Sequence, residues 1–311
     1  MWRRILAFYT RYFVIWVVLG GVAAYAWPDP FRALRGGTTL FFSLTMFGIG
    51  AVLRVEDFKR IAERPTIVLI GSVAQFTIMP LGAFLVARLL GLNDDLTAGL
   101  ILAGSAPGAM ASNVMSYIAK ADTAYSVSLT TVSTLLCPLL TPTLTYILTR
   151  GTKLDVSPWA LMWDVMVMVV IPLLAGFVVR HVFRERLERI EPVFPALSTT
   201  FIVFICSLVI ALNRERLAHV TVPVLGAALL LNAYGLAAGY GVGSAFHLGL
   251  KRRRTLTIEI GMQNAGLGAT LALKNLSDEA AIPAAVFVFV CIFTASGLAS
   301  LWQRITPEPS A

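Results

Sequence analysis

The chain consists of long apolar segments separated by short polar breaks. Most of these segments approach or exceed the roughly 20 residues that a helix needs to cross the hydrocarbon core of a bilayer. None shows the strict alternation of a barrel strand. The ten segments lie at residues 12–27, 38–53, 66–90, 96–118, 123–149, 159–179, 195–212, 221–249, 255–273 and 280–303. The pattern therefore predicts an all-α integral membrane protein with ten transmembrane helices.

Composition agrees with a membrane protein and argues against soluble chemistry. Hydrophobic residues make up 57% of the chain and charged residues 14%, whereas a soluble domain has about 25% charged residues. The polar breaks are too short for a soluble domain, so residues 1–311 are expected to form one membrane unit. Cys137, Cys206 and Cys291 lie in apolar stretches without metal-ligand spacing. No nucleophile–base pair is evident, so the chain predicts neither a transition-metal site nor an enzyme.

The positive charge of the chain sorts by position. The net charge is +8, and with a cytoplasmic N-terminus 17 of the 25 lysines and arginines fall on the inner side. One inner group is Arg180, Arg184, Arg186 and Arg189. This bias predicts a multi-pass protein of the plasma (inner) membrane with both termini cytoplasmic, and it explains the charge without a nucleic-acid partner. A cleaved signal peptide ending near Ala24-Tyr25-Ala26 is the competing interpretation of residues 1–26.

The two halves of the chain share a weak symmetry. Segments one to five align with segments six to ten at a period near 155, and each half contains a glycine-rich interrupted segment. Gln75 precedes Pro107 by 32 residues, as Asn232 precedes Asn264. Because five is odd, the halves would form two inverted five-helix repeats. Interrupted segments at matching places in inverted halves indicate the midplane site of a secondary transporter.

Glu259 is a charge inside an apolar run. No lysine or arginine lies in the middle of any segment to pair with it, and a charge at that depth costs at least ~2.5–3.5 kcal/mol on insertion scales. A cation ligand or a proton carrier is the functional interpretation, and a glutamate snorkelling to the interface is the alternative. Asp164 lies near the start of its segment and is interpreted as interfacial.

Neutral oxygens accompany this carboxylate in the sequence. Ser112 and Asn113 follow the Pro107–Gly108 break, where an interrupted helix exposes carbonyls for a cation and N–H groups for an anion. A stripe at helical spacing follows, formed by Ser126, Thr130, Ser133 or Thr134, Cys137 and Thr141. Hydroxyls that bond to their own helix and small residues that ease helix packing are the bland explanations. One carboxylate among neutral oxygens suits a monovalent cation such as sodium.

The two interrupted segments resemble those of the bile acid:sodium symporter family. Ala106 to Asn113 is similar to the family's Pro-Gly-Gly-x-x-Ser-Asn break, and Glu259 to Asn264 is similar to its Glu-x-Gly-x-Gln-Asn break. The resemblance covers essentially the whole chain and indicates a bacterial-type ten-helix member. It implies crossed discontinuous helices 4 and 9. It also implies a panel domain with helices within 12–53 and 159–212, and a core domain with helices within 66–149 and 221–303.

The resemblance implies sodium-coupled uptake of a small organic anion by alternating access. The anion would be a carboxylate or sulfonate that is pantoate-, ketoacid- or bile-acid-like. The first sodium ligands implied are Ser112, Asn113, Ser126, Thr130 and Glu259. The second set comprises Gln75, Glu259, Gln263 and the backbone carbonyls of Ile260 and Met262. The substrate-binding residues implied are Met110, Ala111, Asn264, Ala265 and Thr294.

The sequence departs from the family pattern where substrate should dock. Ala109 stands in place of the second glycine of the first break, and Met110 stands where relatives often have a small polar residue. All inferred sodium side-chain ligands are present. We therefore expect two sodium ions as coupling ions. We also expect a monomer in the lipid bilayer and no cofactor. A proton-coupled anion carrier using Glu259 and a non-transporting membrane receptor or channel are the alternatives.

Overall fold

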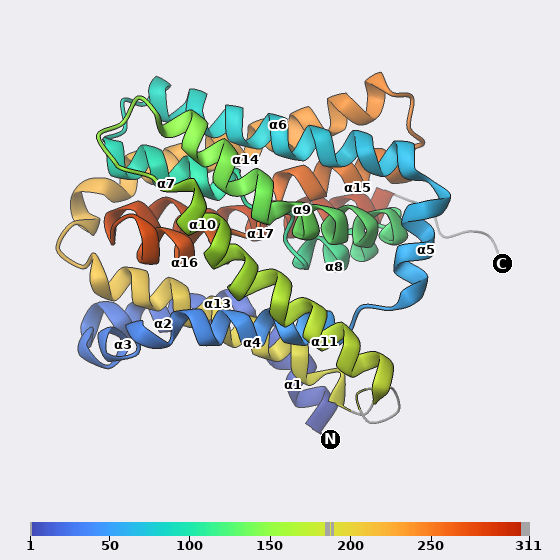
Figure 1. The fold of residues 1–311 in the computed structure, drawn as a ribbon, viewed down its shortest axis with the longest axis horizontal. Helices are drawn as coiled ribbons and strands as arrows, with labels where there is room; N and C mark the ends of the chain where they lie inside the picture. Colours follow the sequence, from blue (N-terminus) through green and yellow to red (C-terminus); the bar gives the residue numbers. More distant parts are fainter. Residues whose placement is uncertain (1, 184–186, 188–189, 306–311) are drawn as a thin grey trace.

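The computed structural model describes residues 2–183, 187 and 190–305, and these residues form helices joined by short connections (Figure 1). The first elements are α1 (Trp2–Arg11), α2 (Phe13–Ala26), α3 (Asp29–Ala33), η1 (Arg35–Gly37), α4 (Thr38–Gly50), α5 (Val55–Glu63), α6 (Pro65–Leu89), α7 (Asp94–Gly104), α8 (Ala111–Ile118) and α9 (Thr123–Thr149). The later elements are α10 (Pro158–Val165), the π-helix η2 (Met166–Val170), α11 (Ile171–Val182), α13 (Val193–Leu212), α14 (Leu217–Ala245), α15 (Leu250–Gly261), α16 (Ala265–Asn275), η3 (Glu279–Ala281) and α17 (Ile282–Ile305).

All ten predicted segments are helical over most of their length. The segment 123–149 coincides with α9, and the two interruptions fall between α7 and α8 and between α15 and α16. Within the described ranges, six helices are long and apolar enough to cross a membrane. The number rises to eight if each of two bent pairs, α1 with α2 and η1–α4 with α5, forms one span.

Polar residues in the short breaks start several of these helices. Asn93 accepts a hydrogen bond from the backbone N–H of Leu96 at 2.9 Å and so caps α7. Asp122 caps α9 in the same way, through the N–H of Tyr125 at 3.1 Å. Such caps satisfy backbone donors that the first helical turn leaves free. The breaks therefore terminate one helix and define where the next begins.

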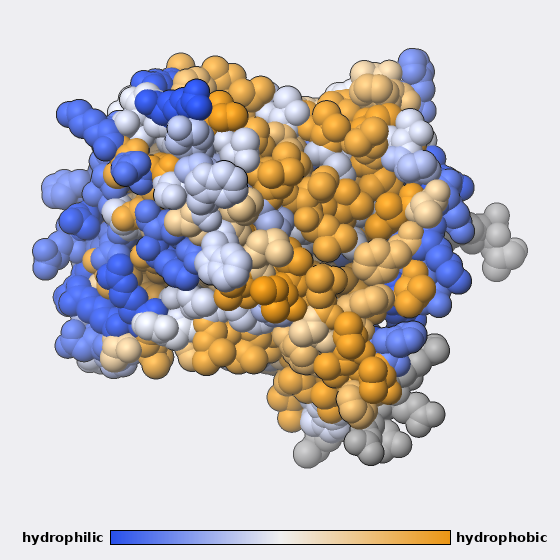
Figure 2. Space-filling model, in the orientation of Figure 1, coloured by the Kyte–Doolittle hydropathy of each residue, from blue (hydrophilic) through white to orange (hydrophobic). Residues whose placement is uncertain are grey.

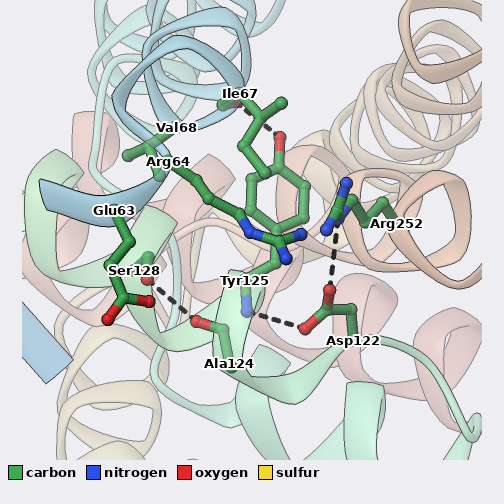
Figure 3. A pocket seen from close by; sticks show the side chains of 9 residues that line it. All are labelled: Glu63, Arg64, Ile67, Val68, Asp122, Ala124, Tyr125, Ser128 and Arg252. Atoms are coloured by element: carbon green, nitrogen blue, oxygen red, sulfur yellow. Dashed lines mark hydrogen bonds and ion pairs between the residues drawn. The ribbon is translucent and has the colours of Figure 1, made fainter. Parts of the chain in front are cut away.

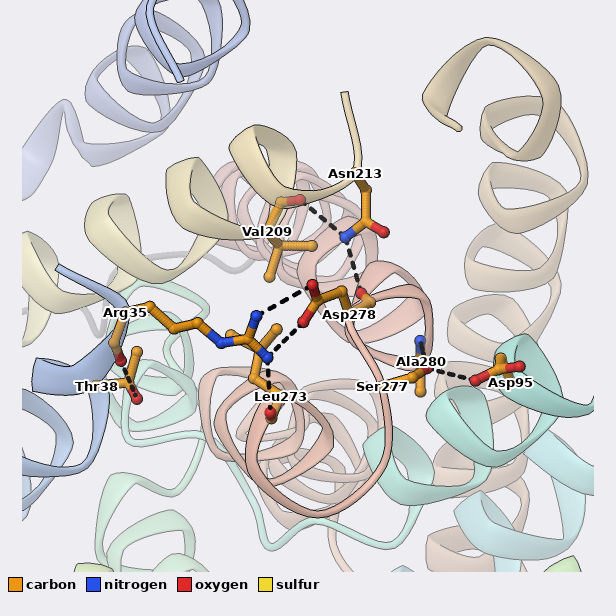
Figure 4. Close-up of polar contacts among 9 residues, drawn as sticks. All are labelled: Arg35, Thr38, Asp95, Val209, Asn213, Leu273, Ser277, Asp278 and Ala280. Atoms are coloured by element: carbon orange, nitrogen blue, oxygen red, sulfur yellow. Dashed lines mark hydrogen bonds and ion pairs between the residues drawn. The ribbon is translucent and has the colours of Figure 1, made fainter. Parts of the chain in front are cut away.

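The helices pack in two groups. Helices α2, α4, α11 and α13 pack together in the lower part of Figure 1, and α6, α7, α9 and α14 to α17 pack together above them. At the left end of the view, polar contacts join the two groups (Figure 4). Arg35 of η1 pairs with Asp278 at 2.7 Å, and the Asn213 amide donates to the Asp278 carbonyl at 2.8 Å.

The visible surface is divided into polar ends and an apolar middle. Hydrophilic residues gather at the left end and along the right edge of Figure 2, and hydrophobic residues cover most of the area between them. Leu69, Val73 and Leu85 of α6 are among the exposed apolar side chains. Three arginines that are expected on the inner side lie outside the described residues, namely Arg184, Arg186 and Arg189. An apolar surface of this extent fits a chain whose solvent is lipid.

Candidate ion-binding site

The two interruptions lie against each other. The backbone N–H of Ala109 donates to the carbonyl of Met262 at 3.0 Å, and the N–H of Asn264 donates to the carbonyl of Pro107 at 2.8 Å. These bonds form a short antiparallel bridge between Gly108 and Gln263. The breaks expose backbone groups that lipid cannot hydrogen-bond, and each break satisfies groups of the other.

The Glu259 carboxylate lies beside this crossing, surrounded by hydroxyls. Its Oε2 accepts hydrogen bonds from Ser112 at 2.6 Å and Ser126 at 2.9 Å, and its Oε1 accepts from Thr130 at 2.5 Å. All four side chains are buried, with Glu259 2% exposed. Within the described part of the chain, no cationic side chain pairs with it. Glu259 lies near the C-terminal end of α15, where the helix dipole is negative. The site thus concentrates negative potential.

The structure brings together all five residues that the resemblance assigns to the first sodium ion. Asn113 joins the group because its Oδ1 lies 3.4 Å from Thr130 Oγ1, which is 3.5 Å from Ser112 Oγ. The residues come from α8, α9 and α15. Three hydroxyls, one amide oxygen and one carboxylate offer the oxygen ligands that a hard cation takes.

The rest of the hydroxyl stripe has structural partners. Ser133 Oγ accepts a hydrogen bond from the Gly108 N–H at 3.2 Å, and Thr141 donates to the Ser105 carbonyl at 2.6 Å. Thr134 donates to the Thr130 carbonyl at 2.7 Å. Thr134 thus bonds to its own helix, as the bland explanation expects, whereas Ser133 and Thr141 contact the backbone around the first break. Ser126 and Thr130, near the N-terminal end of α9, face the carboxylate.

Gly108 is part of the site because a larger residue would not fit there, which the sequence motif alone does not reveal. A Cβ at this position would lie 2.4 Å from Glu259 Oε1 and 3.6 Å from Ser133 Oγ. Real side chains do not approach a carboxylate oxygen so closely. The glycine is therefore what allows the crossing backbone to pass beside the carboxylate.

The second set of implied sodium ligands is only partly assembled. Gln75 Nε2 donates to Gln263 Oε1 at 2.7 Å, and Gln263 Nε2 donates to the Ile260 carbonyl at 3.0 Å. The Met262 carbonyl already accepts from Ala109, and the Glu259 side chain is turned toward Ser112, Ser126 and Thr130. Asn232, singled out by the symmetry of the halves, donates to the Gly261 carbonyl at 2.9 Å. Gln75 Oε1 is buried and has no partner in the described chain.

The residues assigned to substrate are arranged unevenly. Met110, Ala111 and Asn264 are partly exposed at the crossing, but Ala265 is buried, with 1% exposure. Asn264 Oδ1 accepts from the Leu267 N–H at 3.2 Å and so caps α16, whereas none of the described side chains caps α8. Thr294 is partly exposed on α17, which packs against α8, and its hydroxyl donates to the carbonyl of Val290 at 2.9 Å.

Asp164, interpreted as interfacial from the sequence, is buried and paired. It is 7% exposed, with its carboxylate 2.7 Å from Lys274 Nζ and 2.8 Å from Asn275 Nδ2. Both partners lie at the end of α16. The pair joins α10 to α16, so this carboxylate has a cationic partner, whereas Glu259 has none among the described residues.

A multi-pass helical membrane protein with two crossing interruptions and one buried carboxylate among neutral oxygens belongs to the class of ion-coupled transporters. The family model described as the sodium bile acid symporter family matches residues 39–220. The chain belongs to this family. It is therefore a sodium-dependent transporter rather than an enzyme, and its family implies sodium as the coupling ion.

Curated relatives match over most of the chain. The "uncharacterized sodium-dependent transporter YocS" of Bacillus subtilis is 37% identical over 309 residues, which is 99% of this chain and 96% of that protein. The "probable sodium/metabolite cotransporter BASS1, chloroplastic" of Arabidopsis thaliana is 32% identical, covering 95% of this chain and 74% of that protein. The mouse "sodium/bile acid cotransporter 4" is 30% identical, covering 80% of this chain and 58% of that protein.

Proposed function

We propose that this protein is a symporter that uses two sodium ions to take up a small organic anion, a carboxylate or sulfonate, across the inner membrane. The observation that carries the proposal is the buried Glu259 carboxylate, which no cationic side chain of the described residues pairs with and which the hydroxyls of Ser112, Ser126 and Thr130 surround. A sodium ion would occupy the position next to the carboxylate that the hydroxyl protons now take. The three hydroxyls would then rotate and offer their oxygens to the ion.

The proposal includes ten membrane crossings arranged as two inverted repeats. Six single helices and two bent pairs would supply eight crossings. The interrupted pairs α7–α8 and α15–α16 would supply the other two. Both termini would be cytoplasmic. The helices within 12–53 and 159–212 would form the panel, and those within 66–149 and 221–303 the core, in a protein that works as a monomer.

The second sodium ion would bind among Gln75, Glu259, Gln263 and the carbonyls of Ile260 and Met262. The unpartnered Gln75 Oε1 supports this placement, because a buried amide oxygen needs a partner. Binding would require the amides of Gln75 and Gln263 to turn, since they now bond to each other. The ion would thus tighten the crossing of the two breaks.

The anion would bind at the positive ends of the two half-helices, near Met110, Ala111, Asn264, Ala265 and Thr294. No side chain of the described residues caps the α8 N-terminus, so its positive dipole end is the stronger candidate. Rocking of the core against the panel would alternate access to this site. The contact of Asp278 with Arg35, which joins the two groups at one end, and the contact of Asp164 with Lys274 would break and form during this motion.

The test is a thermal-unfolding screen of organic anions on the detergent-purified protein in sodium chloride and in matched potassium chloride. An anion that raises the melting temperature only in sodium identifies the substrate class and shows coupling, because two ligands that enhance each other must do so reciprocally. Uptake of that anion into proteoliposomes should then require a sodium gradient. Stabilisation and uptake that are equal in potassium and follow a pH gradient instead would refute sodium coupling and favour the proton carrier.

A further inference from the structure

A pocket of about 350 Å³ opens beside the α5–α6 junction, where α9 and α15 begin (Figure 3). Its walls include Glu63, Val68, Asp122, Tyr125, Ser128 and Arg252. Arg252 pairs with Asp122 at 3.3 Å, and Arg64 and Glu63 also line the space. The pocket therefore carries balanced charge and does not repel a cation.

One face of α6 leads from this pocket toward the ion-binding site. Val68, Ser72 and Gln75 are spaced by four and three residues, so their side chains share a face. Val68 lines the pocket, and Gln75 bonds to Gln263 at the helix crossing. At 1.5 Å per residue, the face spans roughly 10 Å between them.

Two oxygens on this face have no partner in the described chain. Ser72 is 4% exposed and Gln75 is 3% exposed, and neither Ser72 Oγ nor Gln75 Oε1 has a hydrogen-bond partner. Buried polar atoms are satisfied in folded proteins, by water or an ion where protein groups do not suffice. A hydroxyl and an amide oxygen in succession are the ligands that a partly dehydrated monovalent cation accepts.

Tyr125 lines the pocket and contacts the neighbouring face of α6, which carries Ile67 and Gly71. Its hydroxyl donates to the Ile67 carbonyl at 2.8 Å. A Cβ added to Gly71, the neighbour of Ser72, would lie 2.8 Å from the same hydroxyl oxygen. Because Tyr125 also precedes the ion-site residue Ser126, the inner wall of the pocket and the ion-binding site share one turn of α9.

We propose that this pocket is the inner mouth of a cation path that runs along α6 to Gln75, with Ser72 as the intermediate ligand. The inference rests on the proposed function, because it supplies the route by which sodium leaves its site toward the inner side. Movement of Tyr125 away from Ile67 would open the path. Ser72 would hold the ion for part of the journey and so lower the barrier to release.

Accessibility of position 72 to a cation of similar size tests the path. Ser72→Cys is placed in a background in which Cys137, Cys206 and Cys291 are alanine. Silver nitrate is added to sealed vesicles of either orientation in sodium nitrate or potassium nitrate. Ag⁺ replaces the thiol proton, and thiols that have not reacted are then counted with a fluorescent maleimide after denaturation. Ser207→Cys on α13 is the matched control, because Ser207 is also a buried serine without a partner in the described chain.

We expect Ag⁺ to modify Ser72→Cys at least tenfold faster from the inner face than from the outer face, and more slowly in sodium than in potassium. The Ser207→Cys control should remain unmodified. Absence of modification, or equal rates from both faces, overturns the path. The Cys-free parent is tested separately for stabilisation by sodium. Its failure to respond would overturn the proposed function and the path with it, whereas a responsive parent with an unreactive position 72 overturns the path alone.

A second measurement in the otherwise native chain does not depend on cysteine chemistry. Ser72→Ala should slow dissociation of ²²Na⁺ about tenfold, while half-saturation by sodium stays within twofold. Ser72→Thr keeps the hydroxyl and should dissociate near the parent rate. Equal rates for the alanine variant and the parent contradict a role for Ser72 in release.

Discussion

Gly108→Ala should separate sodium binding from folding. The added Cβ would lie 2.4 Å from Glu259 Oε1, about 1 Å closer than carbon and oxygen atoms pack. The backbone at this point is fixed by the bonds between Ala109 and Met262 and between Gly108 and Ser133. The flexible carboxylate is therefore the group that moves.

The size of the effect follows from the hydrogen bonds of that carboxylate. Oε1 is the oxygen that accepts from Thr130 at 2.5 Å, so displacement breaks or lengthens this contact first. A hydrogen bond to a charged group contributes about 1.5–3 kcal/mol. If the displaced carboxylate weakens sodium binding by the same free energy, the half-saturating sodium concentration rises roughly 10- to 150-fold, at 1.4 kcal/mol per factor of ten.

The assay is thermal unfolding in increasing sodium chloride, with choline chloride holding the ionic strength constant. Gly226→Ala is the matched control, because a Cβ there meets no atom of the described residues within 4 Å. We expect Gly108→Ala to unfold within a few degrees of the parent in choline and to respond only at much higher sodium. An unchanged half-saturating concentration would refute the idea that Gly108 makes room for the carboxylate.

Two further variants test the frame around the site. Gly50→Ala places a Cβ 1.9 Å from the carbonyl oxygen of Leu173, so α4 and α11 must separate. Overpacking of this kind typically costs about 1–3 kcal/mol. We therefore expect a lower melting temperature and an unchanged half-saturating sodium concentration. Asp164→Asn removes the charge that faces Lys274 and Asn275. Because Asp164 is buried, we expect a loss of about 1.5–3 kcal/mol in denaturant unfolding. A loss of sodium binding in either variant, or no effect of Gly50→Ala on stability, would contradict these assignments.

The sequence predicted the helices better than the contacts between them. The apolar run 123–149 and the helix Thr123–Thr149 coincide, because a long lipid-exposed segment must satisfy its backbone internally. The interruption before Ser112 was visible as a Pro-Gly pair that no regular helix continues through. Local patterns of this kind are complete within a few residues, so they can be found without knowledge of the fold.

Such local patterns do not reveal the contacts between segments that are distant in the sequence. Asp164 meets Lys274 across 110 residues, and nothing in either local sequence points to the other. The steric role of Gly108 depends on the position of Glu259, which the motif alone does not give. Unpartnered atoms such as Ser72 Oγ become visible only when the packing around them is known. The hydroxyls at Ser126 and Thr130 were found because helical spacing placed them on one face.

We propose that Glu259 and its hydroxyl neighbours hold sodium. Equilibrium binding of ²²Na⁺ to the detergent-purified protein tests it most directly, in the parent, in Glu259→Gln and in Asp164→Asn. The two variants each neutralise one buried carboxylate, of which only the first lies at the proposed site. We expect saturable binding in the parent and in Asp164→Asn, and no saturable binding in Glu259→Gln. Binding to Glu259→Gln with the affinity of the parent would contradict it.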